Sequence, residues 1–294
     1  MEITVFTPTY NRVELLERCY ESMKQQTCQD FIWMIVDDGS TDNTRDVVNQ
    51  WMKEEHLFEM KYYHKPNGGL HTAYNEAIEH IETPLCMCID SDDFMPDNAI
   101  EIILDFWEKN GSEQYAGIVG LDYSLEGKVI GDFLPEQKTI NLIDLLVGKY
   151  HIINGDRTNV VRTELYKKYA PMKVFEGEKN FNPHYLHLQI SKEYDFLVLN
   201  ENIRFVEYQP AGMSASILKQ YKNSPNSFIE TRKLYLEFAD TPLKFKIRNS
   251  IHLTSSAILA NRKGDAIAEN PYKYLAIMTY PFGWLLSHYI RRKG

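Results

Sequence analysis

The sequence predicts an α/β protein whose mainly parallel central sheet is flanked by helices. Two observations carry this prediction. Residues 1–110 alternate between short apolar runs typical of strands and segments with helical hydrophobic periodicity. Each strand-like run is also followed directly by a polar segment, as expected where parallel strands end at a ligand-binding edge.

The composition is that of an ordinary globular protein. The chain has 294 residues, of which 44% are hydrophobic, enough for a sizeable core in one large domain or two closely packed ones. Its net charge of −9 argues against a general nucleic-acid binder, which normally carries a basic surface. No nucleic-acid partner is therefore expected.

The first residues and the cysteines indicate a cytoplasmic protein. The opening stretch MEITVFTPTY has neither a basic segment nor a long apolar one, so no leader peptide is expected. The four cysteines are too few and too unevenly spaced for a disulfide framework or a zinc site. We expect reduced, buried thiols.

Four strand and helix pairs are predicted in succession. The strands are expected at residues 3–7, 31–37, 60–64 and 84–90, and the helices that follow them at residues 13–26, 43–55, 71–81 and 97–109. In the first helix, Leu16, Cys19 and Met23 recur at helical spacing and define one apolar face. Because parallel strands need crossover connections, which are usually helical, this order predicts a parallel sheet.

The segments that follow the four strands are PTYNR, DDGSTD, KPNGGLH and DSDD. Taken singly they are weak signals, since DDGSTD and PNGG also suit ordinary turns and helix starts. The dinucleotide pattern G-x-G-x-x-G and the P-loop pattern G-x-x-x-x-G-K-[ST] are both absent. These two kinds of nucleotide site are therefore excluded.

The acidic cluster DSDD is the strongest single feature. In an extended segment Asp90 and Asp92 point to the same side, and close carboxylates require a cation or a bound proton. Mg²⁺ and Mn²⁺ are often held by one or two carboxylates, with substrate phosphates completing the shell. The alternative is a solvated loop in which Asp93 or Asp97 caps the next helix.

Taken together, the motifs resemble a known family. TPTYNR, VDDGSTD, NGGLHTAYN and IDSDD, in this order and spacing, resemble the inverting family 2 glycosyltransferases of the GT-A fold across residues 1–110. GDRTNVVRTELY, FEGEKNF and VEYQPAGMSAS more loosely resemble acceptor-side segments of the bacterial members that build surface polysaccharides.

The resemblance implies a nucleotide-sugar site at the ends of the strands. Its expected members are Thr7, Pro8 and Tyr10 against the base, Asp38 on the base edge or ribose, Asn67, Gly69 and His71 near the nucleoside and diphosphate, and Asp90 and Asp92 as the DXD pair that binds ribose and metal. Mn²⁺ or Mg²⁺ is the implied cofactor. For His71, a neighbour of a helix N-cap or a packed surface imidazole remains an alternative.

The general base for the acceptor hydroxyl is expected in FEGEKNFNPHYLHLQI. Glu178 fits an acidic position familiar in similar proteins. After Pro183, where similar proteins commonly carry an acidic residue, this chain has His184, which can also act as a base near neutral pH. The assignment stays open between Glu178 and His184, each with a surface position as its alternative.

The chain is expected to divide by function. Residues 1–120 form the donor half, residues 121–225 the acceptor-side half of the same domain, and residues 226–294 a C-terminal helical extension. Asp156, Arg157 and residues 207–216 either shape the sugar and acceptor pocket or form turns. The aromatic and basic tail is too short and interrupted to span a bilayer, and it either closes the core or meets the membrane interface.

The expected function is therefore transfer of a sugar, with inversion, from a uridine diphosphate sugar to a glycan or lipid-linked glycan acceptor in bacterial surface-polysaccharide synthesis. A sugar nucleotidyltransferase is one alternative, although its usual Gly-rich N-terminal loop is missing. A non-catalytic nucleotide-sugar-binding protein is another. A receiver-type phosphoacceptor domain is much shorter and does not explain NGGLHTAYN.

Overall fold

The computed structural model of the chain describes residues 1–153, 155–208 and 216–294. These residues form two compact units. The first unit comprises residues 1–68, 72–172 and 186–208 and contains the sheet. The second comprises residues 69–71 and 173–185 with the part of the chain that follows residue 208, and it contains the C-terminal helices.

The first half of the chain forms the predicted strand and helix pairs. The strands are β1 (Ile3–Thr9), β2 (Phe31–Asp37), β3 (Glu59–His64) and β4 (Leu85–Cys88), and the helices are α1 (Val13–Lys24), α2 (Thr44–Trp51), α3 (Leu70–His80) and α4 (Ala99–Asn110). Helix α2 is shorter than predicted. It ends at Trp51, the last residue of its buried face, and the C-cap residue Met52 is 43% exposed.

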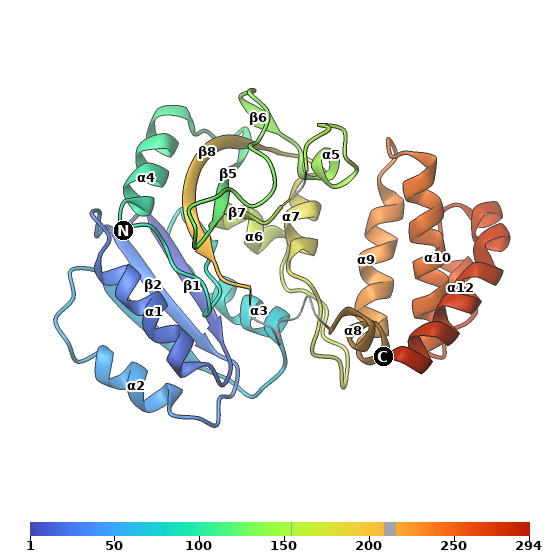
Figure 1. Ribbon diagram of the computed structural model, residues 1–294, viewed down its shortest axis with the longest axis horizontal. Coiled ribbons are helices and arrows are strands. Elements are labelled where there is room, and N and C mark those ends of the chain that lie inside the picture. Colours follow the sequence, from blue (N-terminus) through green and yellow to red (C-terminus); the bar gives the residue numbers. More distant parts are fainter. Residues whose placement is uncertain (154, 209–215) are drawn as a thin grey trace. The chain divides into compact units, whose positions relative to one another are not determined.

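The remaining elements complete one eight-stranded sheet (Figure 1). They are β5 (Tyr115–Ser124), β6 (Thr139–Ile140), α5 (Leu142–Leu146), β7 (Arg157–Arg162), α6 (Thr163–Tyr169), α7 (His184–Ile190) and β8 (Asp195–Val206). The strand order is β3-β2-β1-β4-β7-β5-β8-β6. The β1–β2, β2–β3, β1–β4 and β5–β8 pairs are parallel, whereas the β4–β7, β5–β7 and β6–β8 pairs are antiparallel. Residue 120 lies within β5, so the two predicted halves share a strand.

Both faces of the sheet are covered, as buried strands on both sides require. On one face Val5 and Trp33 pack under α1, α2 and α4, where the Tyr20 ring stacks on Trp51 with centroids 4.2 Å apart. On the other face Phe6 meets Tyr74 of α3 edge to face at 4.8 Å. The period-2 alternation of β1 thus sends neighbouring side chains into opposite layers.

Thr7 takes a core position on this strand. Its side chain is fully buried, and its hydroxyl oxygen accepts a hydrogen bond from Trp33 Nε1 at 3.0 Å. A buried indole N–H needs such an acceptor. Thr7 therefore supports the packing of β1 on β2, and its side chain is closed to solvent.

The second unit consists mainly of helices. These are α8 (Ile217–Asn223), α9 (Pro225–Glu237), α10 (Leu243–Leu259), α11 (Asp265–Ala268) and α12 (Lys273–Lys293). Helices α9, α10 and α12 lie side by side (Figure 1) around a small core that includes Ile229, Leu253 and Ala257. Gly283 of α12 packs so closely on α10 that a Cβ there would lie 2.4 Å from Thr254.

Two further expectations concern the cysteines and the membrane. All four cysteines are free thiols, with Cys19 and Cys86 buried and Cys28 and Cys88 partly buried. Across residues 1–153, 155–208 and 216–294, none of the helices combines the length and the apolar character that crossing a bilayer would need.

Replacing Thr7 by valine should lower the free energy of unfolding by about 1–3 kcal/mol, because the Trp33 N–H loses its buried acceptor. Thr7→Ser keeps the hydroxyl and is the matched control. Urea unfolding followed by tryptophan fluorescence measures the difference. If Thr7→Val leaves the stability unchanged but abolishes nucleotide binding, Thr7 contacts the base as the sequence predicted.

Candidate active site

The loops after β2 and β3 are tied together by Asp38. Its carboxylate is almost fully buried and accepts hydrogen bonds from Lys65 Nζ at 2.6 Å, Gly68 N at 2.9 Å and Asn67 Nδ2 at 3.0 Å. Gly39, with a φ of +80°, sits so close to this loop that a Cβ would lie 2.7 Å from Asn67 N. Asp38 and Asn67, both predicted nucleotide contacts, therefore fix the shape of these two loops.

The loop after β1 presents one open aromatic ring. Pro8 is buried like Thr7, whereas Tyr10 is 45% exposed. Beside it, Asn11 Oδ1 accepts a hydrogen bond from Thr41 N at 2.7 Å, which holds this loop against the DDGSTD turn. Of the three residues predicted to lie against the base, Thr7 and Pro8 are buried and Tyr10 is exposed.

Gly69 and His71 belong to the second unit. Gly69 has a φ of +95°, and a Cβ there would lie 2.0 Å from the carbonyl oxygen of Lys179, so only glycine fits. His71 is fully buried, and its ring centroid lies 6.1 Å from that of Phe181. His71 is therefore not the packed surface imidazole considered as one of its alternatives.

The acidic cluster is held by two arginines. Arg204 of β8 lies 3.5 Å from Asp90, 3.3 Å from Asp93 and in direct contact with Asp122 of β5. On the opposite side, Arg12 Nη1 donates to Asp92 Oδ2 at 2.9 Å. The cluster is not a helix cap, because α4 begins only at Ala99 and its N-cap residue is Asn98.

Charge within this cluster does not balance. Four carboxylates, of Asp90, Asp92, Asp93 and Asp122, face two guanidinium groups, so full ionisation would leave a net charge of −2. Burial raises the pKa of Asp93 to about 8, against the opposing effect of Arg204. Burial likewise raises the pKa of Asp90, and the neighbouring Asp92 adds to this. The surplus carboxylates therefore tend to take up protons near neutral pH, and a bound cation would replace those protons.

A divalent cation fits this donor set. Asp90 keeps 46% of its side-chain surface exposed despite its depth, and Asp92 keeps 17%, so both remain within reach of a ligand. The described parts of the chain contain no group of three or more His, Cys, Asp or Glu residues arranged to hold a metal by themselves. The two carboxylates instead suit Mg²⁺ or Mn²⁺ that shares its shell with phosphates and water.

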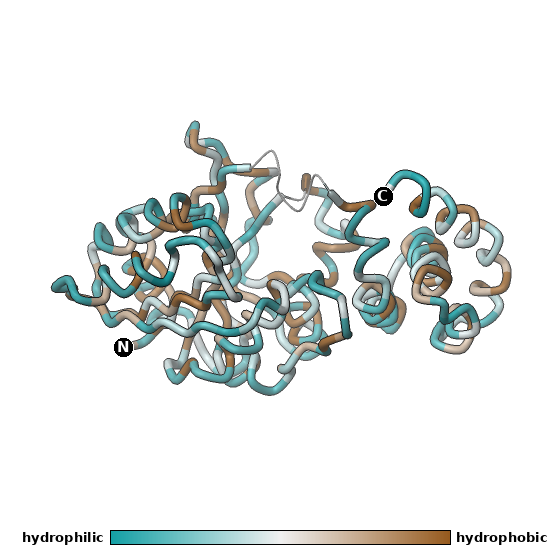
Figure 2. The backbone as a smooth tube through the Cα atoms, turned by 90° about the horizontal axis from the view of Figure 1, so that it is seen from below, coloured by the Kyte–Doolittle hydropathy of each residue, from teal (hydrophilic) through white to brown (hydrophobic). Residues whose placement is uncertain are grey.

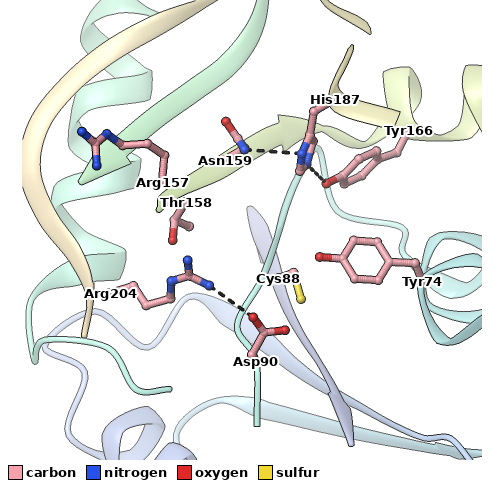
Figure 3. A pocket seen from close by; sticks show the side chains of 9 residues that line it. All are labelled: Tyr74, Cys88, Asp90, Arg157, Thr158, Asn159, Tyr166, His187 and Arg204. Carbon is pink, nitrogen blue, oxygen red and sulfur yellow. Dashed lines mark hydrogen bonds and ion pairs between the residues drawn. The ribbon is translucent and has the colours of Figure 1, made fainter. Parts of the chain in front are cut away.

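A polar cavity of ≈ 60 Å³ lies beside Asp90 (Figure 3). His187 occupies one wall, where its Nε2 lies 2.5 Å from the Tyr166 hydroxyl and its Nδ1 lies 3.4 Å from Asn159 Nδ2. Arg204 points across the cavity toward Asp90. This volume holds a few water molecules and is too small for a whole sugar.

The predicted pocket-shaping segment is only partly described. Arg157 lines the cavity and donates to the backbone oxygen of Ile130, while Asp156 accepts a hydrogen bond from the Tyr208 hydroxyl at 2.7 Å. The predicted residues 209–215 lie outside the described residues.

The Glu178 carboxylate binds the first turn of helix α9. Its carboxylate, only 6% exposed, accepts four hydrogen bonds of 2.7–2.8 Å from the backbone and side-chain donors of Asn226 and Ser227 in the first turn of α9. These donors are the groups that a helix start leaves without intrahelical partners. Glu178 is therefore not the surface carboxylate that the sequence offered as its alternative.

His184 is the first residue of α7. It is partly buried, and burial lowers its pKa to about 4. The imidazole is accordingly neutral at pH 7 and can accept a proton, but it is a weaker base than an ordinary histidine.

Sequence reasoning missed the arginine side of the cluster. Arg204 and Asp122 were not singled out, nor were His187 and Tyr166 of the cavity. One signal was present, since the strand segment IRFV carries a single arginine among apolar residues. A cation inside a sheet must be paired, so this arginine pointed to carboxylate partners.

Comparison with known proteins agrees with the fold and the motifs. Residues 4–129 match the family described as Glycosyl transferase family 2. A curated relative, the teichoic acid poly(glycerol phosphate) polymerase of Staphylococcus epidermidis, is 26% identical over an alignment that covers 100% of this chain and 46% of the polymerase. The chain thus spans less than half the length of such relatives.

Two solved structures share the fold. The S. aureus TarS fragment 1–349 in complex with UDP-GlcNAc is 15% identical, with a TM-score of 0.60 over 99% of this chain and 92% of that one. The mannosyltransferase PcManGT from Pyrobaculum calidifontis, in complex with GDP-Man and Mn²⁺, is also 15% identical, with a TM-score of 0.60 over 99% and 86% of the two chains. The chain therefore has the fold of the GT-A glycosyltransferases, its residues 4–129 match Glycosyl transferase family 2, and in sequence it resembles a bacterial teichoic acid polymerase.

Proposed function

We propose that the chain transfers a sugar, with inversion, from a UDP sugar to a glycan or lipid-linked glycan acceptor of a bacterial surface polysaccharide. The observation that carries this proposal is the surplus of carboxylates over arginines at the end of the sheet, which suits a divalent cation together with a diphosphate. The relatives' names support the acceptor class, and the UDP-GlcNAc bound to TarS supports the donor class.

The donor is placed by residues at the ends of β1 to β4. Tyr10 offers its exposed ring to the base, while Asp38 and Asn67 hold the two neighbouring loops in shape. Asp90 and Asp92 would hold Mn²⁺ or Mg²⁺. When bound, such an ion stabilises the negative charge that grows on the departing diphosphate.

In the transfer itself, the acceptor oxygen forms a bond to the anomeric carbon while the bond from that carbon to the diphosphate breaks. The electron pair of the broken bond stays on the diphosphate, and the acceptor proton passes to a general base. Because four hydrogen bonds engage the Glu178 carboxylate at α9, we assign this role to His184.

A non-catalytic nucleotide-sugar-binding protein is the second candidate, because hydrogen bonds engage the Glu178 carboxylate and burial lowers the pKa of His184. Metal-dependent hydrolysis of the donor, even if slow, would separate the two functions.

For the enzyme we propose a cytoplasmic location with peripheral contact at the inner face of the membrane, where a lipid-linked acceptor would be found.

Thermal shifts with UDP, GDP, dTDP and CMP, each with and without Mn²⁺, test the donor site. We expect UDP to stabilise the protein only with metal, by about 2.7 kcal/mol at a concentration one hundred times Kd. Asp92→Ala should abolish this shift. Asp105→Ala, which removes an exposed carboxylate on α4, is the matched control. No shift for wild type with any nucleotide would remove the support for a donor site.

His184→Gln should reduce kcat by about 10²–10⁴-fold without lowering the melting temperature, because only the proton acceptor is lost. With a pKa of about 4, the imidazole is protonated below that pH and cannot accept a proton. The wild-type rate should therefore rise through about pH 4 and stay level to neutrality.

Glu178→Gln separates the two assignments. Its amide N–H groups would face the donors of Asn226 and Ser227, so we expect a loss of about 1–3 kcal/mol in unfolding free energy. A Glu178→Gln protein of wild-type stability but without turnover would instead assign the base to Glu178.

A further inference from the structure

Helix α12 carries an apolar face that no described residue covers. Its buried side consists of Ala276, Thr279, Gly283, Ser287 and Ile290. The other side exposes Tyr274 (87%), Ile277 (56%), Met278 (73%), Phe282 (59%), Trp284 (47%), Leu285 (58%) and Tyr289 (53%). We call these seven residues the α12 face.

The α12 face differs from an ordinary solvent-facing helix side. Residues 274–290 contain no Asp, Glu, Lys or Arg, although the water-facing side of a globular helix normally carries charges. Its members recur at spacings of three and four, so they form a stripe about 22 Å long on one side of the helix. Such a continuous exposed apolar surface marks an interaction site.

The charge around the α12 face is opposite to that of the rest of the chain. Residues 243–294 contain nine lysine and arginine residues and two acidic ones, a net charge of +7 in a chain whose net charge is −9. Arg291, Arg292 and Lys293 end α12 and are exposed; they form the teal end of the tube at the C label in Figure 2. A surface that meets this region must therefore tolerate or attract positive charge.

We propose that the α12 face docks on the surface of a lipid bilayer that contains anionic lipids, with the helix lying in the plane of the interface. Tyr274, Trp284 and Tyr289 supply the amphipathic rings that favour the headgroup level, and the basic end of the helix attracts anionic headgroups. A second copy is a poorer occupant, because two regions of charge +7 would repel each other. The docking stands on these residues alone, and its use in reaching a lipid-linked acceptor rests on the proposed function.

Vesicle flotation of the full chain tests this proposal. Wild type should bind vesicles rich in phosphatidylglycerol, bind less as salt is raised, and not bind pure phosphatidylcholine. The double variant Met278→Glu/Leu285→Glu should bind the anionic vesicles at least about tenfold more weakly, because two apolar side chains that the bilayer would bury are replaced by carboxylates. Leu57→Glu changes an 84% exposed leucine of the first unit and should bind like wild type.

Two controls make the outcome decisive. The double variant should keep the melting temperature and the metal-dependent UDP shift of wild type, so lost flotation cannot be ascribed to misfolding or to a failed donor site. Flotation of the double variant equal to wild type, or no flotation of wild type, would overturn the proposal. A wild-type dimer that the double variant converts to a monomer would also overturn it, in favour of a second copy.

Discussion

The end of the sheet depends on one guanidinium group, that of Arg204. It joins Asp90 and Asp93 of the loop after β4 to Asp122 of β5, three carboxylates that would otherwise repel one another at the same edge. Burial alone would lower the pKa of Arg204, but the carboxylates raise it well above its usual value, so its charge is permanent. A fixed internal cation of this kind allows acidic side chains to be gathered where a strand ends.

The carboxylates of the cluster differ in burial, and the more exposed ones can still bind a further cation. Asp122 is fully buried and also accepts a hydrogen bond from the Thr158 hydroxyl at 2.7 Å, so it serves mainly to position Arg204. Asp90 is the more exposed partner, and the Asp92 carboxylate pairs with Arg12 near the surface, while its backbone oxygen accepts a hydrogen bond from Arg18. The buried pair of Arg204 and Asp122 fixes the geometry of the cluster, while the carboxylates of Asp90 and Asp92 remain within reach of a metal and a diphosphate.

The local part of this arrangement could be predicted from the sequence. Hydrophobic periodicity placed the four strand and helix pairs, and the position of DSDD at a strand end pointed to the site. Arg204 could not be found in this way, because 114 residues separate it from Asp90 and their contact depends on the β4-β7-β5-β8 strand order. The hydrogen bonds of Glu178 could not be foreseen for a similar reason, since its partners in α9 lie 48 and 49 residues further along the chain. Thr7 sits in the core because of the alternation of β1, which the family motif does not reveal.

Mn²⁺ binding followed by electron paramagnetic resonance tests the central claim most directly, because it needs neither the sugar nor the acceptor to be known. Free Mn²⁺ would be titrated with wild type, Asp90→Asn and Asp92→Asn, with and without UDP. The account predicts one Mn²⁺ per wild-type chain, held more tightly when UDP is present, and loss of this UDP-dependent binding in both variants. Binding that is independent of UDP, or unchanged in both variants, would contradict the assignment of the acidic cluster as the metal and diphosphate site.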